Sequence, residues 1–281
     1  MGRPLAGGSQ RIVLGVVLYQ NSTVQIDRLV RSVELNQQLL TSVDLDLAWL
    51  DNSPDGACNW VADLVPAGAT YQQAGWNIGF AAGHNRLMKV AFESDDTSAY
   101  VCVNPDAVLH PRCLMEMKRE SERAPAPGLI DARLFPEEHP KPYHPITHDT
   151  PWCSGCVLWI SRELFRQAGG FDEEFFMYCE DVDLSWRARA LGFPVRTAPA
   201  GLVHHHAEGR PILRDRELAV RRSAAYLGYK YGSKVFAEKY LGEYLALGGR
   251  PVLFPSASLA SAAEAKFANF DHLLQFCQPR W

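Results

Sequence analysis

Three carboxylates, Glu180, Asp181 and Asp183, stand close together in the sequence and could perform acid–base chemistry. They follow an aromatic run and open a segment with helical spacing, in which Leu184 and Leu191 fall on one face. The free N–H groups and the macrodipole at a helix start favour negative charge, so these carboxylates are expected to be ionised near neutral pH. An ionised carboxylate can accept the proton of a hydroxyl that attacks an electrophile. Acids in a first helical turn also serve as ordinary helix caps, and only their surroundings separate the two interpretations.

The composition is typical of a globular protein and argues against a nucleic-acid partner. The 281 residues are 47% hydrophobic and 21% charged, and 28 basic against 32 acidic side chains leave a formal net charge of −4. The longest apolar run, near residues 12–19, is far shorter than the roughly 20 residues that span a bilayer. Because the first eleven residues also lack the apolar core of a secretory signal, we expect a cytoplasmic protein.

The seven cysteines are odd in number and scattered, and several lie in apolar stretches. This usage predicts free buried thiols in a reducing compartment. Cys153 and Cys156 form a CxxC pair, which would suit a redox pair or half of a zinc site. Because no second CxxC completes such a zinc site, we favour a structural role for both.

Apolar runs and amphipathic segments alternate along most of the chain, which predicts an α/β fold with a mainly parallel sheet. Proline-rich residues 125–151 are predicted to form a flexible loop over the site. The basic and aromatic segment 213–247 is predicted to be a helical packing or dimerisation arm, with contact to a membrane surface as the alternative. The predicted strands are residues 11–19, 45–50, 69–72, 99–103, 156–160 and 193–198, and the other helices lie around 26–33, 82–92, 111–123 and 161–168.

Polar residues follow three of the predicted strands, at the points where these strands end. Asn21 follows the first strand, Asp51 follows the second, and Asn104 and Asp106 follow the strand that ends at Val103. In open α/β sheets ligands bind beyond the carboxyl ends of the strands, where such loops gather. A nucleotide is the kind of ligand that this edge can hold.

Several motifs in a fixed order resemble family 2 glycosyltransferases, and most closely their rhamnosyltransferase-like branch. The resemblance covers about residues 12–232 and ends in Lys-Tyr-Gly at 230–232. A series of motifs in this order is far more specific than any one of them. The matching stretches are YQNS at 19–22, LDNSPDG at 50–56, NIGFAAGHN at 77–85, VNPD at 103–106, SG at 154–155, GFDEEFFMYCEDVDL at 170–184, and Arg187.

This resemblance implies a GT-A fold, which is a Rossmann-like, mainly parallel mixed sheet flanked by helices. Residues 1–210 would form the nucleotide-sugar-binding and catalytic domain, and residues 211–281 a C-terminal helical extension packed on it. The donor would lie across the carboxyl edge of the sheet with Mg²⁺ or Mn²⁺ on its diphosphate.

The resemblance also assigns roles to individual residues. Asp51 would hold the base or ribose, Asp106 and His204 would bind the metal, and Asp181 would be the catalytic base. Glu180 would stand beside it in the substrate site. The complete predicted substrate-binding set is Tyr19, Asn21, Asp51, Asn77, Gly79, Gly83, Asn104, Asp106, Trp152, Ser154, Gly155, Glu180 and Arg187.

The sequence departs from the family pattern at two positions, and some simpler interpretations stay open. Asn104 replaces the first acid of the DxD metal motif, and His84 stands where relatives often have asparagine. Asn-Pro-Asp is also a common turn. Of the histidines at 204–206 we choose His204 by its spacing from residue 200, with His206 next. Trp152 is equally suited to a core position and to stacking on a sugar ring.

These features together predict an inverting glycosyltransferase that moves rhamnose from dTDP-rhamnose to a saccharide or lipid-linked acceptor in cell-surface polysaccharide synthesis. A UDP-sugar is the alternative donor. A homodimer and peripheral contact with the inner face of the membrane are further expectations. A sugar nucleotidyltransferase and a non-catalytic nucleotide-sugar-binding protein are the competing functions. The first would usually need a basic glycine-rich loop near residues 18–25, which contain no lysine or arginine, and the second would not need Asp181.

Overall fold

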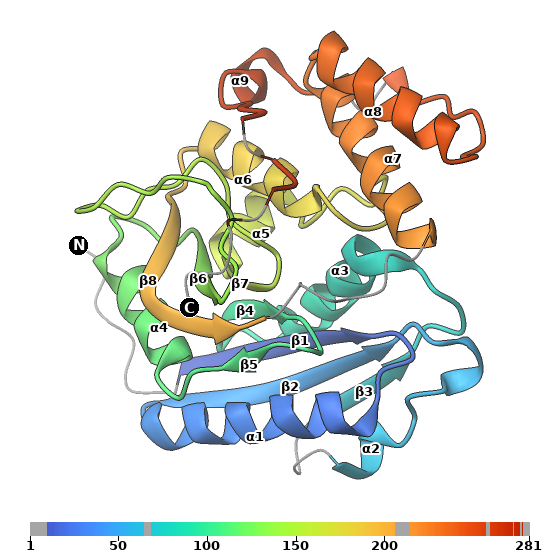
Figure 1. Cartoon of the computed structure of the whole chain (residues 1–281). Helices are drawn as coiled ribbons and strands as arrows, with labels where there is room; N and C mark the ends of the chain where they lie inside the picture. The colour runs from blue at the N-terminus through green and yellow to red at the C-terminus, as the bar shows by residue number, and fades with distance from the viewer. Residues whose placement is uncertain are drawn as a thin grey trace.

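A single mixed sheet of eight strands forms the centre of the computed structural model, which describes residues 10–64, 69–205, 214–256, 259–271, 273–275 and 277. The strand order is β3-β2-β1-β4-β7-β6-β8-β5, with helices on both faces (Figure 1). The strands are β1 (Gln10–Leu18), β2 (Val43–Asp51), β3 (Thr70–Gln73), β4 (Thr97–Val103), β5 (Val108–Leu109), β6 (Leu129–Phe135), β7 (Val157–Ser161) and β8 (Val195–His204).

The first half of the sheet is parallel and the second half is mixed. Strands β1, β2, β3 and β4 pair in parallel, whereas β7 is antiparallel to both of its neighbours, β4 and β6. Strand β8 runs parallel to β6 and antiparallel to β5. The carboxyl ends of β1, β2 and β4 therefore meet at one edge, as the sequence predicts for a parallel sheet.

The helices cover the sheet because alternate strand residues point to opposite faces. On β1, Ile12 and Leu14 pack in the apolar cluster beneath α1 and α4, while Val13 belongs to the cluster beneath α3, α5 and α6. The helices are α1 (Thr23–Leu39), α2 (Val61–Leu64), α3 (Gly79–Ala91), α4 (Cys113–Arg123), α5 (Arg162–Ala168), α6 (Glu180–Ala190), α7 (Arg214–Lys230), α8 (Lys234–Ala246) and α9 (Ala262–Ala265), with a 3₁₀ turn at Pro54–Gly56.

The predicted α/β class and the predicted order of strands and helices are confirmed. The helix expected to end at the glycines at 169–170 is α5, whose Ser161 side chain accepts from the Leu164 N–H and whose end has Gly169 in the left-handed conformation at φ 78°. All seven cysteines are free thiols, as expected from their scatter. Among the described residues, no helix is both long enough and apolar enough to cross a bilayer.

One segment prediction is wrong. Residues 125–151 contain β6, which is a central strand of the sheet and pairs with β7 and β8. Its apolar stretch, Leu129–Phe135, is only seven residues long and lies between prolines, which concealed it. The segment 213–247 is helical, as predicted, and it forms two helices because the chain turns at Gly232 with φ 73° and α8 packs back on α7.

A buried ion network joins α7 to α6. The Lys230 ammonium lies 2.7 Å from Asp172 Oδ2 and 2.6 Å from Asp183 Oδ1, and Asp183 is fully buried. The Tyr231 hydroxyl donates to Asp183 Oδ1 at 3.0 Å, and Arg187 donates to Asp183 Oδ2 at 2.7 Å. Because Asp183 belongs to the first turn of α6, this network ties the C-terminal helices to the segment that carries Glu180 and Asp181.

Replacing Lys230 with methionine should lower the free energy of unfolding by about 3 kcal/mol, because it removes one partner from a buried network and leaves the carboxylates of Asp172 and Asp183 short of a cation. Denaturant unfolding followed by circular dichroism measures this change. Lys234→Met is the matched control, since Lys234 is exposed on the neighbouring helix and pairs with Glu238 at 3.7 Å. A loss for Lys230→Met no larger than the control's would contradict the network's contribution.

Candidate active site

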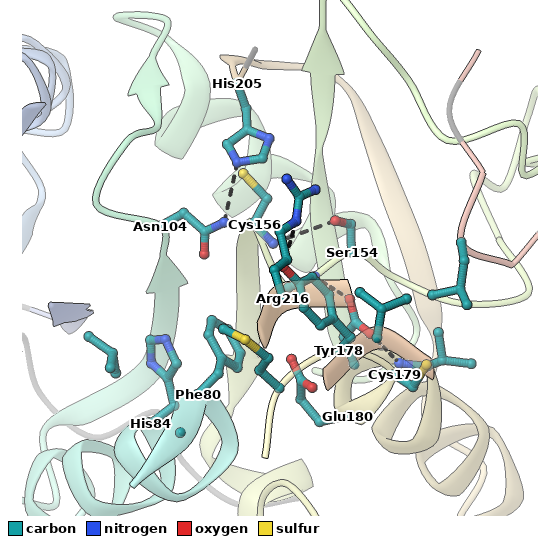
Figure 2. Close-up of a pocket in the computed structure, with 18 of the residues that line it drawn as sticks. Phe80, His84, Asn104, Ser154, Cys156, Tyr178, Cys179, Glu180, His205 and Arg216 are labelled. Atoms are coloured by element: carbon teal, nitrogen blue, oxygen red, sulfur yellow. Dashed lines mark hydrogen bonds between the residues drawn. The ribbon is translucent and has the colours of Figure 1, made fainter. Parts of the chain in front are cut away.

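A cavity of about 700 Å³ opens at the carboxyl edge of the sheet (Figure 2). Its walls come from the loops after β1, β2 and β4, the segment 152–156 before β7, the start of α6, and the C-terminal helices α7 and α8. This volume lies within the range that small-molecule sites commonly show.

The start of α6 carries the predicted acid–base groups into this cavity. Tyr178 and Cys179 both adopt the left-handed conformation, with φ of 69° and 68°. Each such non-glycine residue costs on the order of 1–3 kcal/mol and persists only where surrounding structure holds it. The two residues turn the chain sharply before α6, so that Glu180 and Asp181 both line the cavity.

Asp181 is the better placed of the two acids to act as a base. Its Oδ2 accepts the Gly155 N–H at 2.7 Å, and its Oδ1 accepts the Val182 N–H at 2.8 Å. Burial raises the pKa of Asp181, while these two N–H groups favour its ionised form and limit the rise. Each carboxylate oxygen keeps a second lone pair with which it can accept a proton.

Glu180 has a different environment, although it is the adjacent residue. It is 4% exposed, and its Oε2 has no hydrogen-bond partner among the described residues. Burial, and then the charge of Asp181, raise the pKa of Glu180 well above its usual value. Burial of Glu180 therefore opposes the ionised form that a helix start favours.

Asp106 and His205 face each other at another part of the cavity. His205 Nε2 lies 3.4 Å from Asp106 Oδ1 and 3.4 Å from the Asn104 side-chain nitrogen. Burial opposes protonation of His205, but its contacts with Cys156 and Asp106 outweigh burial and raise the pKa of His205 to about 10. A carboxylate, an amide and an imidazole are a donor set that fits Mg²⁺ or Mn²⁺.

The structure favours His205 over His204 as the candidate metal ligand. His204 is exposed, its ring lies 6.0 Å from that of Phe135, and it does not line the cavity. Residues alternate between the two faces of a strand, so that the histidine after His204 turns toward Asp106. His206 lies outside the described residues. No group of three or more histidine, cysteine or acidic side chains with metal-binding geometry occurs in the described part of the chain, so substrate oxygens and water would complete the shell.

The cavity brings together most of the predicted substrate-binding residues. Trp152 is nearly fully buried yet forms part of the wall, so its core position and its place in the site are compatible. The predicted residues that line the cavity are Tyr19, Asn21, Asn77, Gly79, Asn104, Asp106, Trp152, Ser154, Gly155, Glu180 and Asp181.

Asp51 does not line the cavity, and Asn52 does. The Asp51 carboxylate is fully buried and accepts from the N–H groups of Ser53 and Cys58, at 2.8 and 3.0 Å, and from the Tyr71 hydroxyl at 2.9 Å. It therefore holds the loop after β2 in shape. Asn52 donates to the Gly79 carbonyl at 2.9 Å, and its side-chain oxygen is without a hydrogen-bond partner within the described ranges.

Gly83 and Arg187 also lie away from the cavity, for packing reasons. A Cβ on Gly83 would come within 2.9 Å of Val17, so this glycine lets α3 approach β1. Arg187 donates to the carbonyls of Ala168 and Gly170 and pairs with the buried Asp183. Asp183 and Arg187 thus form a buried ion pair that stabilises the fold and does not contact the cavity.

Position 79 requires a glycine, because both its backbone conformation and its surroundings exclude a side chain. Its φ is 86°, and a Cβ there would meet the Phe176 carbonyl oxygen at 2.2 Å. The Phe80 N–H donates to that same carbonyl at 2.7 Å, and Asn77 Oδ1 accepts from the Gly79 N–H at 3.0 Å. The motif around Gly79 therefore joins the start of α3 to the aromatic segment before α6.

Several cavity residues escaped the sequence analysis as members of the site. His84 is fully buried, and its Nδ1 lies 2.7 Å from the Tyr100 hydroxyl; burial lowers its pKa to about 3, which leaves a neutral ring at the cavity. The departure of His84 from the family pattern was the one feature of the sequence that could have marked it as a site residue. No sequence motif marked Arg216 or Lys239 as a site residue, because they reach the cavity only through the packing of α7 and α8 on the rest of the fold. The residues concerned are Val17, Asn52, Phe80, His84, Val103, Pro105, Leu134, His139, Cys156, Met177, Tyr178, Cys179, Val182, His205, Arg216, Glu217, Val220, Arg221, Lys239, Tyr240, Glu243, Leu273 and Leu274.

Comparison with known proteins supports a glycosyltransferase fold. No model of a known protein family matches the chain. The chain is 42% identical over 96 residues to an N-acetylglucosaminyl-diphospho-decaprenol L-rhamnosyltransferase of Mycobacterium tuberculosis, covering 34% of this chain and 28% of that protein. It is 38% identical over 56 residues to rhamnosyltransferase WbbL of Escherichia coli, covering 20% and 21%. The chain thus spans only about a quarter of the length of these relatives.

Among solved structures, the chain resembles the mannosyltransferase PcManGT from Pyrobaculum calidifontis, which was solved with GDP-Man and Mn²⁺. The TM-score is 0.59 at 17% identity, and the match covers 84% of this chain and 68% of that one. The GT-A fold expected from the motifs is confirmed. The sequence resemblance to the rhamnosyltransferase-like branch is confirmed as well.

Replacing His204 and His205 with alanine, one at a time, tests which of them binds the metal. His205→Ala should raise the Kd for Mn²⁺, measured with a nucleoside diphosphate present, by at least about tenfold, because it removes a donor next to Asp106. His204→Ala should leave that Kd within about twofold, since His204 is exposed and does not line the cavity. Isothermal titration calorimetry measures both. A larger loss in His204→Ala than in His205→Ala would restore the original choice of ligand.

Proposed function

We propose that this chain is an inverting glycosyltransferase that moves a sugar, with rhamnose from dTDP-rhamnose as the leading donor, to a saccharide or lipid-linked acceptor. The observation that carries the proposal is that Asp181 and Asp106, which come from distant parts of the sequence, line one cavity of about 700 Å³. The rhamnosyltransferase names of the partial relatives support the choice of sugar, and PcManGT supports a nucleotide-sugar donor.

The residues of the cavity suit an in-line displacement. The acceptor hydroxyl would hydrogen-bond to Asp181 and give its proton to a carboxylate oxygen as its own oxygen attacks the anomeric carbon. The new bond forms on the face opposite the one between that carbon and the nucleoside diphosphate, which breaks, so the configuration inverts. The Gly155 N–H holds the Asp181 carboxylate in place during this transfer.

The remaining polar groups of the cavity would bind and orient the substrates. Glu180, whose burial favours the neutral form, would donate a hydrogen bond to a substrate hydroxyl. Asn21 and Asn52 would contact the nucleoside from the ends of β1 and β2. Asp106 and His205, with Asn104, would hold a divalent metal, which when bound neutralises charge on the diphosphate.

Partners and location follow from the same proposal. We infer that the enzyme works in the cytoplasm, with contact to the inner face of the membrane when its acceptor is lipid-linked, in cell-surface polysaccharide synthesis. A homodimer remains a prediction. The nucleotide of the donor, dTDP or UDP, is to be decided by ligand binding.

The test of this function is a comparison of the wild-type protein with Asp181→Asn. Wild-type protein should release nucleoside diphosphate from its nucleotide sugar when acceptor is supplied, and be stabilised against heat by dTDP or UDP with Mn²⁺. Asp181→Asn should reduce kcat by about 10²–10⁴-fold, because asparagine cannot take the proton, and keep the thermal stabilisation. Unchanged turnover in Asp181→Asn would remove the assigned base. Failure of dTDP, UDP and GDP alike to stabilise the wild-type protein would remove the donor site.

The pH dependence of kcat/KM should report the raised pKa of Asp181. The base works only when ionised, so kcat/KM should fall as the pH falls through this pKa, which lies above the ordinary aspartate value of about 3.9. Glu180→Gln should leave the position of this acidic limb unchanged, because glutamine imitates the neutral carboxyl group. A limb that moves to lower pH in Glu180→Gln would mean that Glu180 is charged in the working enzyme.

A further inference from the structure

The wall of the cavity formed by α7 and α8 has two positive charges that no carboxylate of that wall neutralises. It carries three basic side chains, Arg216, Arg221 and Lys239, and two acidic ones, Glu217 and Glu243. Arg221 pairs with both acids, at 2.5 Å from Glu217 and 3.3 Å from Glu243. In the part of the chain that the structure describes, Arg216 and Lys239 therefore form no ion pair with Glu217 or Glu243.

Arg216 is held in a way that suits ligand binding. Its Nε donates to the Tyr178 hydroxyl at 3.1 Å, and within the described part of the chain it has no carboxylate partner. Figure 2 shows its side chain in the same cavity as Asn104 and His205. Because a neutral hydroxyl fixes one edge of the guanidinium, the charge and the remaining N–H donors stay available for an anion.

Lys239 adds a second cation from the neighbouring helix. Its ammonium lies 4.9 Å from the Tyr240 ring centroid, and within the described ranges it forms no ion pair. The other cavity walls carry Asp181 and the pair formed by Asp106 and His205, so neither has a surplus of positive charge. A doubly charged anion such as a diphosphate would therefore be drawn to α7 and α8 rather than to these walls.

The proposed function supplies two diphosphates, one in the donor and one in a lipid-linked acceptor. The donor diphosphate would share the metal held at Asp106 and His205, which leaves the helical cations for the other. The chain around α8 also exposes apolar side chains that suit a lipid, with Val235 82% exposed and Leu253 99% exposed. Resting on the proposed function, we propose that Arg216 and Lys239 form a second diphosphate subsite, which holds the diphosphate of a lipid-linked acceptor.

The direct test uses inorganic pyrophosphate in the absence of divalent metal, and it does not depend on transferase activity. Wild-type protein should bind pyrophosphate, and Arg216→Met and Lys239→Met should each weaken this binding by about tenfold, since each removes a charge-assisted contact. Lys234→Met is the matched control, because Lys234 lies on α8 but outside the cavity wall. Calorimetry measures the Kd values. Equal binding by Arg216→Met and the wild-type protein would overturn the subsite.

Kinetics then identify which diphosphate the subsite holds. For Arg216→Met, KM should rise about tenfold for a sugar–diphosphate–lipid acceptor and stay unchanged for an alkyl glycoside of the same sugar, with an unchanged Kd for dTDP or UDP measured with Mn²⁺. A weakened nucleotide Kd with unchanged acceptor preference would assign the subsite to the donor and overturn the acceptor assignment. Equal rises in KM for both acceptors would overturn it too.

These experiments separate the subsite from the proposed function. A wild-type protein that binds pyrophosphate through Arg216 but neither binds nucleotide nor transfers sugar would refute the proposed function and leave the anion site in place. Thermal denaturation of each variant checks that it is folded, and Arg216→Lys, which keeps the charge, should retain part of the pyrophosphate binding.

Discussion

A buried carboxylate needs hydrogen-bond donors, and this requirement organises the site around Asp181. The Gly155 N–H, from the segment before β7, meets Oδ2 of Asp181 at 2.7 Å. This contact joins the middle of the sheet to the start of α6, and two left-handed residues turn the chain so that it can form. Burial, and then the charge of Asp181, raise the pKa of Glu180 and favour its neutral form. Two adjacent acids thereby acquire different chemistry from their surroundings.

The same segment is held from behind by the C-terminal helices. Lys230 contacts both Asp172 and Asp183, so the aromatic stretch before α6 and the first turn of α6 are tied to one cation on α7. The Lys-Tyr-Gly motif that ends the family resemblance thus has a physical purpose: lysine and tyrosine bind Asp183, and glycine permits the turn into α8. The C-terminal helices support the segment that carries Asp181 and also supply one wall of the cavity.

At two positions the residue that lines the cavity is the sequence neighbour of the predicted residue. Asp51 was expected to face the ligand, yet its carboxylate closes the loop after β2 while Asn52 faces the cavity. The spacing favours His204, yet His204 is exposed and His205 lines the cavity beside Asp106. In both cases the residue that lines the cavity is the one after the predicted residue, because side chains at the end of a strand alternate in direction.

The sequence by itself determined the α/β class, most strands and helices and the family resemblance, and it singled out Asp181 as the candidate base, because these depend on local periodicity and on residue types in order. Only the tertiary structure decided which polar residues share one cavity. In the folded chain the proline-rich segment contains β6, Arg187 bonds the Gly170 carbonyl instead of lining the cavity, and Arg216 lies in the cavity wall. Burial and charge balance arise from contacts between residues far apart in the chain, and such contacts leave no periodic signal along it.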